Sequence, residues 1–154
     1  MRNSDSKQRL VIDTYAWIEY FRGSVEGVKV ENLINSADEV CTPSIVIAEL
    51  SDKYRRERIQ EWNIRKRFIK LKTKILVLDE IIADNAGEHK QELRNTYKDV
   101  GLADAIVVAH AHERSARIIT GDKHLRQLDN AIDITSDDTN SKESSRRVNG
   151  GKKE

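Results

Sequence analysis

The sequence has very little of what builds disulfides, membrane spans and exported proteins. Its one cysteine, Cys41, excludes an internal disulfide and a zinc site made of several thiolates. No apolar run approaches the roughly 18 residues that a membrane-spanning helix needs, and the first nine residues lack the apolar stretch of a secretory signal. We therefore expect a protein of the reducing cytoplasm, with no membrane as a partner.

Several motifs of enzyme chemistry are missing as well. The seven glycines form neither GxGxxG nor GxxxxGKS/T, which excludes a glycine-rich phosphate loop. The sequence also lacks HExxH, the helical zinc motif of metalloproteases, and GxSxG, the turn that carries a serine nucleophile. A function must therefore be sought in other residue types.

Charge of both signs is abundant and almost cancels. The chain has 154 residues, of which 27 are Lys or Arg and 26 are Asp or Glu, for a net charge of +1. A disordered polyelectrolyte needs a large net charge, so a single folded domain is the better interpretation of this length. Polar composition predicts an N-terminal arm over residues 1–9 and a disordered tail over 136–154, around a folded domain at 10–135.

Short apolar runs alternate with longer amphipathic stretches along the chain. Runs without polar alternation are typical of strands buried on both faces of a parallel sheet, and they occur at residues 10–12, 40–42, 75–78, 118–120 and 132–134. Helices are expected between them, at 14–21 with Thr14 as cap and Gly23 as its end, and at 43–60 with Thr42 as cap and Pro43 as first residue. Further helices are expected at 62–71, at 80–97 with Asp79 as cap, and at 101–115. This alternation predicts an α/β fold with a central parallel sheet.

Four carboxylates stand where such a sheet places ligands, at the carboxyl ends of the strands. Asp13 follows the first strand directly, and Asp122 follows the strand at 117–120 through Gly121. Asp104 lies among alanine and valine in the first turn of a helix, and Glu49 lies in the helix that starts after the second strand. Because Thr14 is expected to cap the first helix, Asp13 is expected to be free to face the site.

Each of these carboxylates also has a purely structural interpretation. Asp13 and Asp122 suit turns or caps, the latter for a short helix at 123–128. Glu49 suits an ion pair with Lys53 one turn later, and Asp104 suits the positive end of its own helix. Taken together, however, converging carboxylates repel one another, and a divalent cation with oxygen ligands, such as Mg²⁺, relieves that repulsion.

Histidines contribute little to this prediction. His110 and His112 are two residues apart on a helix and so face different ways. His89 and His124 are expected at the surface, although His124 is close to Asp122 in the sequence.

Four short runs in order resemble the acidic motifs of PIN domains, over residues 10–134. These runs are Val11–Trp17, Ile45–Leu50, Gly101–Ala109 and Ile119–Leu125. The small size resembles the VapC-type toxin nucleases within that family. Tyr15 is a departure, because many such toxins carry a serine there.

The resemblance implies a PIN-like α/β/α sandwich and a metal-dependent endoribonuclease, the toxin of a type II toxin–antitoxin pair. It implies that Asp13, Glu49, Asp104 and Asp122 are catalytic and bind Mg²⁺ or Mn²⁺, and that the hydroxyls of Thr14 and Thr120 support them. It also implies RNA as substrate, a protein antitoxin and a homodimer as partners. The alternatives are a non-catalytic PIN-like module that binds RNA or ribosomes, and, less well matched, a phosphoryl-transfer domain of receiver type.

Positive charge is concentrated between residues 53 and 74. Ten of these residues are Lys or Arg and two are Glu, so the segment carries +8 and the rest of the chain −7. Such a segment is a candidate phosphate-binding surface, for which we name Arg55, Arg65, Lys66 and Arg67, although a solvated helical face is the simpler alternative. Its aromatic residues Tyr54, Trp62 and Phe68 suit either base stacking or packing.

Overall fold

The computed structural model describes residues 6–137, so most of the expected arm and residues 138–154 of the expected tail lie outside the described residues. The elements follow one another as β1 (Arg9–Ile12), α1 (Thr14–Arg22), α2 (Val25–Ser36), β2 (Glu39–Pro43), α3 (Ser44–Arg56), α4 (Trp62–Lys72), β3 (Lys74–Leu76), α5 (Glu80–Arg94), α6 (Leu102–Glu113), β4 (Arg117–Thr120) and β5 (Ala131–Asp133).

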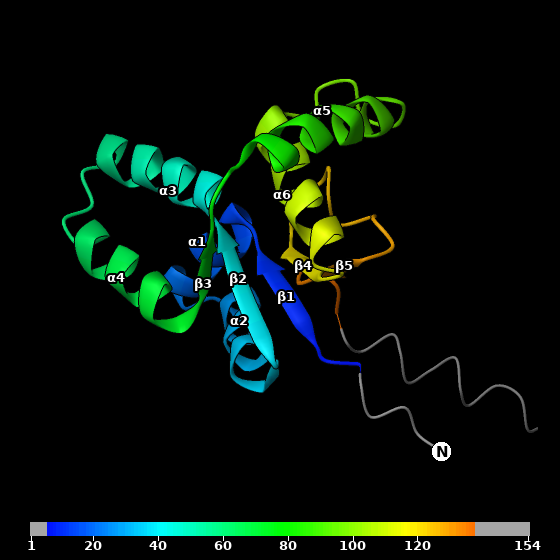
Figure 1. Ribbon diagram of the computed structural model, residues 1–154. Helices are drawn as coiled ribbons and strands as arrows, with labels where there is room; N and C mark the ends of the chain where they lie inside the picture. Colours follow the sequence, from blue (N-terminus) through cyan, green and yellow to red (C-terminus); the bar gives the residue numbers. More distant parts are fainter. Residues whose placement is uncertain (1–5, 138–154) are drawn as a thin grey trace, which may run out of the picture.

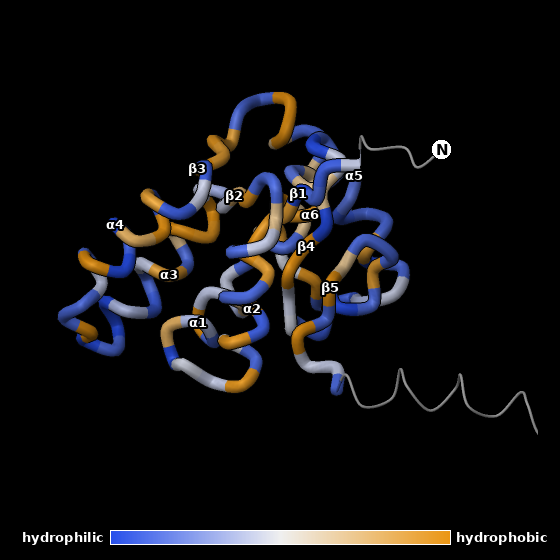
Figure 2. Tube along the Cα trace, turned by 90° about the horizontal axis from the view of Figure 1, so that it is seen from below, coloured by the Kyte–Doolittle hydropathy of each residue, from blue (hydrophilic) through white to orange (hydrophobic). Residues whose placement is uncertain are grey.

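The five strands form one parallel sheet in the order β3-β2-β1-β4-β5. Val11 of the central strand pairs with Cys41 of β2 on one side and with Ile118 of β4 on the other. Helices α1 and α2 lie on one face of the sheet and α5 and α6 on the opposite face, as Figures 1 and 2 show together. The predicted α/β/α sandwich with a central parallel sheet is therefore confirmed.

The apolar runs became strands because both faces of the sheet are covered. Leu10, Val11, Ile12, Ile118 and Ile119 have no exposed surface. Because helices cover both faces of the sheet, side chains on either face are buried, and the strands need no alternation of polar and apolar residues. The core therefore sits in the strands that also carry the predicted site residues at their carboxyl ends.

Helix α3 starts one residue later than expected and ends earlier. Pro43 is the last residue of β2 and the N-cap of α3 rather than its first residue. Thr42 does not cap the helix, because its hydroxyl accepts a hydrogen bond from Trp17 Nε1 (3.1 Å). The helix stops at Arg56, short of residue 60, where Arg58 adopts a φ of 56° in the turn to α4.

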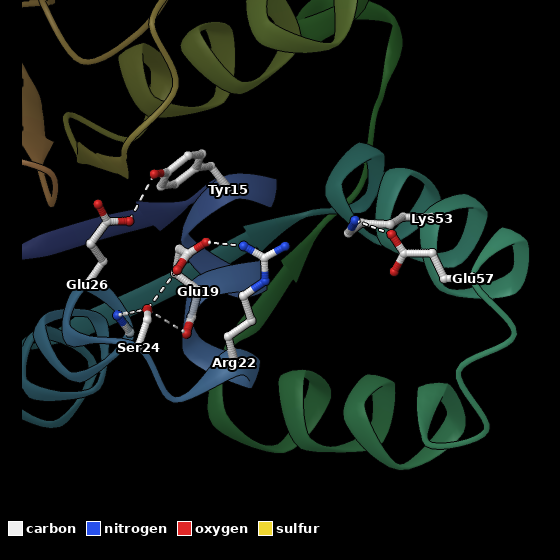
Figure 3. A network of polar contacts seen from close by, with 8 residues as sticks. Tyr15, Glu19, Arg22, Ser24, Glu26, Lys53 and Glu57 are labelled. Carbon is white, nitrogen blue, oxygen red and sulfur yellow. Dashed lines mark hydrogen bonds and ion pairs between the residues drawn. The ribbon is translucent and has the colours of Figure 1, made fainter.

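Helix α2 was not expected from the sequence. Ser24 caps it by accepting from the Gly27 backbone N–H (3.0 Å), and Gly27 lies against the Glu19 carbonyl of α1. Figure 3 shows this junction, where Ser24 also donates to the Glu19 carboxylate and Arg22 pairs with it. The buried face of α2 is short and consists of Val30, Leu33 and Ile34, whereas Val25 and Val28 at its start are exposed, so its apolar pattern is weak in the sequence.

Helices α3 and α4 run in opposite directions beyond the β3 edge of the sheet, as Figure 1 shows. Helix α3 packs against both α1 and α6. Thr14 at the start of α1 hydrogen-bonds to Glu49 in the second turn of α3, whose charge also acts on Asp104 in the first turn of α6. Among the helices described, none is long and apolar enough to cross a membrane.

Candidate active site

The predicted acidic residues come from four separate elements at one edge of the sheet. Asp13 follows β1, Asp122 comes two residues after β4, Asp104 is in the first turn of α6 and Glu49 is in the second turn of α3. Strands β1 and β4 are parallel neighbours, so their carboxyl ends are adjacent. The packing of α3 against α6 brings Glu49 close enough for its charge to act on Asp104.

Asp13 is the most deeply buried of the four, with 4% of its surface exposed. Its pKa is raised to about 7, mainly by burial and also by the charges of Asp122 and Asp104, although hydrogen bonds from the Thr120 side chain and the Ala16 N–H oppose the rise. The expectation that Thr14 caps α1 is wrong, because Asp13 is the cap and accepts from Ala16 N at 2.9 Å. One Asp13 oxygen is therefore fixed by the helix.

The Asp104 carboxyl is partly buried, with a quarter of its side chain exposed. Burial raises its pKa to about 6, and the charges of Asp122 and Glu49 contribute, while His124 and the Gly101 backbone lower it. The mutual repulsion that the sequence predicts among these carboxylates is thus present in the fold.

Glu49 is exposed at the rim of this group and is held by α1. Thr14 Oγ1 donates a hydrogen bond to Glu49 Oε1 at 2.7 Å. The alternative of an ion pair between Glu49 and Lys53 is not realised, because Lys53 pairs with Glu57, as Figure 3 shows. The Thr14 hydroxyl is therefore free of capping and is used to orient this carboxylate.

Asp122 begins a turn. Residues 123–128, which the structure describes, form turns and a bend and not the short helix that the sequence predicts. Asp122 Oδ1 accepts from the His124 backbone N–H (2.8 Å), and the Asp122 N–H donates to Thr120 Oγ1 (3.0 Å). These bonds close the chain into a turn instead of a helix, and they fix Asp122 between Thr120 and His124.

His124 is a site residue that the sequence reasoning missed. It was expected at the surface, but only 9% of it is exposed, and its ring lies next to Asp104 and Asp122. Asp104, Asp122 and His124 each offer a ligand atom, all within 4.8 Å of one another. The available signal was its position two residues after Asp122, whereas Asp99, which contacts its other nitrogen, had no sequence signal.

Tyr15 does not supply a hydroxyl to the acidic group. Its O–H donates to Glu26 Oε2 of α2 at 2.9 Å, and burial raises the pKa of Tyr15 to about 12 (Figure 3). Its ring lies across Gly121, where a Cβ atom would come within 2.1 Å of the ring. The residue that departs from the family pattern thus packs between the Asp122 turn and α2.

The basic segment divides into packed and open residues. The Arg65 guanidinium lies over the rings of Tyr54 (4.8 Å) and Phe21 (5.2 Å), which places it in an aromatic cluster. Tyr54 and Trp62 are 4% exposed and contact each other, so packing is the interpretation that the fold supports for this pair.

Lys66, Arg67 and Lys70, by contrast, line an open groove of about 550 Å³ along α4. Arg55 is exposed near the end of α3, where its Nε donates to Ser51. Solvent and a polyanion can therefore reach these side chains, as they can the exposed Arg56, Arg58, Lys72 and Lys74 of the same segment.

The donor set at the sheet edge fits a hard divalent cation. Carboxylate oxygens predominate, which suits Mg²⁺ or Mn²⁺. Burial, together with the charges of the neighbouring carboxylates, raises the pKa values of Asp13 and Asp104, so the ionised forms of both groups are costly here. A cation bound among these oxygens removes that cost.

The chain is similar to known proteins over most of its length. The PIN domain family model matches residues 10–131. A toxin–antitoxin complex from Klebsiella pneumoniae has a chain that is similar in structure (TM-score 0.62, 21% identity, 81% of this chain and 97% of that chain covered). VapBC-1 from nontypeable Haemophilus influenzae is similar too (TM-score 0.60, 21% identity, 84% and 100% covered).

A third similar structure is Mycobacterium tuberculosis VapC20, described as a toxin that cleaves the sarcin-ricin loop (TM-score 0.56, 16% identity, 70% and 85% covered). A search of curated proteins found no match. At these identities the solved structures establish a shared fold. The family model matches most of the chain and therefore establishes family membership. The chain belongs to the PIN domain family.

Proposed function

We propose that this protein is a metal-dependent endoribonuclease that hydrolyses phosphodiester bonds in RNA, as the toxin of a type II toxin–antitoxin pair. The observation that carries the proposal is the convergence of Asp13, Asp104 and Asp122 at one sheet edge, with burial and mutual charge raising the pKa of the first two. A fold has little reason to collect buried like charges unless a cation or substrate uses them.

Asp13, Glu49, Asp104 and Asp122 would hold Mg²⁺ or Mn²⁺. When bound, such an ion acidifies a water and offsets the charge on the phosphate. The chain's own contribution is orientation: Thr120 and the Ala16 N–H hold Asp13, Thr14 holds Glu49, and the Thr120 hydroxyl fixes the start of the Asp122 turn. In this proposal Thr14 and Thr120 are positioning residues.

RNA would reach this edge along α3 and α4. Glu49 lies on the rim, and α3 continues from it to Arg55 and then to the open groove beside Lys66 and Arg67. We include these three basic residues in the proposed phosphate contacts, because they are open to solvent and the acidic site needs nearby positive charge to retain a polyanion. Arg65 stays a prediction, since its guanidinium is already stacked on two rings.

The proposed partners follow from the similar structures. The chains from Klebsiella pneumoniae and Haemophilus influenzae are parts of toxin–antitoxin assemblies. We accordingly propose that a protein antitoxin blocks the acidic edge of this chain, that the chain forms a homodimer, and that it acts in the cytoplasm. We also propose residues 10–135 as its folded nuclease domain.

The decisive experiment is cleavage of a single-stranded RNA by the purified protein with Mg²⁺, with Mn²⁺ and with EDTA. Cleavage is expected only with metal, leaving 5′-phosphate and 3′-hydroxyl ends. Asp104→Asn should abolish it, whereas the control Asp84→Asn, on the exposed face of α5, should cleave as the wild type does.

Two results would contradict the proposal. Cleavage that continues unchanged in EDTA would exclude the metal mechanism. Tight RNA binding with no cleavage under any metal would favour the non-catalytic RNA-binding alternative.

A further inference from the structure

We propose that His124 is an additional ligand of the metal site, binding through Nδ1 while Asp99 holds the ring from behind. This inference rests on the proposed metal site, and it adds a nitrogen donor to a site that the sequence and the family motifs describe by carboxylates alone. His124 is nine-tenths buried, and its place in the turn after β4 leaves its ring among the acidic residues of three elements.

The Nε2 atom of His124 is already occupied. It lies 3.1 Å from Asp99 Oδ1, in a hydrogen bond. An ionised carboxylate only accepts, so Nε2 must carry the hydrogen. In the neutral ring this leaves the lone pair on Nδ1, which is the arrangement found when a carboxylate orients a metal-binding histidine.

The Nδ1 atom faces the acidic residues without a proper hydrogen bond to them. It is 3.3 Å from Asp122 Oδ1 and 3.4 Å from Asp104 Oδ2. Charge-assisted N–H···O bonds are shorter, at about 2.7–2.9 Å. Neighbouring ligands of a six-coordinate ion with bonds of about 2.1 Å are about 3.0 Å apart, so the spacing suits two edges of a coordination shell better than a salt bridge.

The ring has little freedom to leave this position. The edge of Tyr97 packs against it, with 5.3 Å between ring centroids and an interplanar angle of 75°. The His124 backbone N–H holds Asp122 Oδ1 at 2.8 Å, which couples the ring to the carboxylate that it faces. Asp99 is itself held by Lys123 Nζ at 3.4 Å. A ligand fixed in advance in this way loses little entropy on binding.

A nitrogen ligand changes which ions the site prefers. Imidazole suits transition ions, whereas Mg²⁺ strongly favours oxygen. The wild-type site should therefore bind Mn²⁺ more tightly than Mg²⁺, and the preference should shrink when His124 is replaced by an oxygen donor.

The test uses pulsed EPR of the untagged full chain with Mn²⁺, because an imidazole bound to Mn²⁺ imposes a nitrogen coupling on the echo. Wild type should show that coupling, and it should change to the ¹⁵N pattern when the histidines are ¹⁵N-labelled. His124→Asn should remove it and weaken Mn²⁺ binding by about tenfold or more, while Mg²⁺ binding changes by less than about threefold.

His89→Asn, which alters a half-buried histidine on α5, is the matched control and should keep both the coupling and the affinity. Asp99→Ala should keep the coupling but lower Mn²⁺ affinity about tenfold, as loss of an orienting partner does. Unchanged affinity in that variant would overturn the role given to Asp99.

The outcomes separate this inference from the function on which it rests. Mn²⁺ that binds at one site without nitrogen coupling, or with a coupling that survives His124→Asn, would overturn the ligand role and leave the carboxylate site standing. Absence of any Mn²⁺ binding would overturn both proposals. A wild-type spectrum without nitrogen coupling overturns the ligand role by itself, so the proposal can fail even if no variant folds.

Discussion

Asp104 illustrates how a single carboxyl can be costly to the fold and useful to the site. Its pKa, about 6, lies above the ordinary value of 3.8. Between these pH values the folded state binds more protons than the unfolded chain, so stability falls as pH rises through this window and stays reduced above it.

Asp104→Asn removes that charge at nearly the same shape. At pH 7.5 in EDTA we expect the variant to be more stable than wild type by about 1–2 kcal/mol, after allowance for the partial exposure of the side chain. Urea unfolding at pH 7.5 and pH 4.5 measures this, and the advantage should shrink at the lower pH. A variant that is less stable at pH 7.5 would show that Asp104 serves mainly the helix end.

His110 presents the opposite case. It is 2% exposed on α6, and its Nε2 has no hydrogen-bond partner among the described residues. Burial lowers its pKa from 6.5, although the charges of Glu113 and Asp79 oppose this and that of Arg114 adds to it. The folded state therefore excludes a proton that the unfolded chain accepts, and stability falls as pH drops below 6.5.

His110→Leu removes the proton-binding group. We expect the stability of the variant, measured against that of wild type, to be greater at pH 5 than at pH 8. Thermal or urea unfolding at both pH values measures the difference. If the stability difference between variant and wild type is the same at both pH values, folded His110 takes up a proton at pH 5 as readily as the unfolded chain does.

At the scale of elements, the contact between α1 and α2 depends on the absence of one side chain. A Cβ atom on Gly27 would lie 2.1 Å from the Glu19 carbonyl oxygen and 2.7 Å from its carbon. These are backbone atoms, so the clash cannot be relieved by a side-chain rotation. The sequence does not announce this close approach, which adds to the packing of Val30, Leu33 and Ile34 on the core.

Gly27→Ala should therefore lower the unfolding free energy by about 1–3 kcal/mol. Its matched control is Gly87→Ala in the interior of α5, where nothing lies within 4 Å of the added carbon. That change should raise stability by roughly 0.5–1 kcal/mol through helix propensity. Equal effects of the two substitutions, measured by urea unfolding, would contradict this account of the helix contact.

Over the whole molecule, charge is divided between the basic segment and the acidic remainder. Most of that segment lies on α3 and α4, beyond the β3 edge of the sheet (Figure 1), whereas the four site carboxylates lie where β1 and β4 end and α3 and α6 begin. A polyanion would therefore be attracted by one region and retained near the other only if a cation is present.

Lys66→Glu combined with Arg67→Glu should weaken RNA binding and make it less dependent on salt. Loss of two phosphate contacts on a single strand reduces the slope of log affinity against log salt by about 1.4. The control is the same change of charge on α5, Lys90→Glu with Arg94→Glu, which should leave the slope unchanged. Binding is measured by fluorescence anisotropy in EDTA, and equal slopes in both variants would mean that the α4 groove is only a solvated surface.

Much of the architecture was determined by the sequence alone. The apolar runs predict the strands because a sheet covered on both faces needs uninterrupted apolar residues. Asp79 predicts the start of α5, where its side chain accepts from Ile82 N at 2.9 Å, and Gly23 predicts the end of α1, where its φ is 65°. These signals are local, since each depends on a few consecutive residues.

The composition of the site was decided only by the tertiary structure. Asp13 caps α1, and the Thr14 hydroxyl binds Glu49 instead. This division of roles depends on α3, because Glu49 lies 35 residues after Thr14 in the sequence. The sequence predicts His124 at the surface, but Tyr97 packs against its ring and Asp99 hydrogen-bonds to its Nε2 atom in the folded chain. Burial and charge act through space, so the pKa of Asp104 and the surroundings of His124 exist only once β1, β4, α3 and α6 have met at one edge of the sheet.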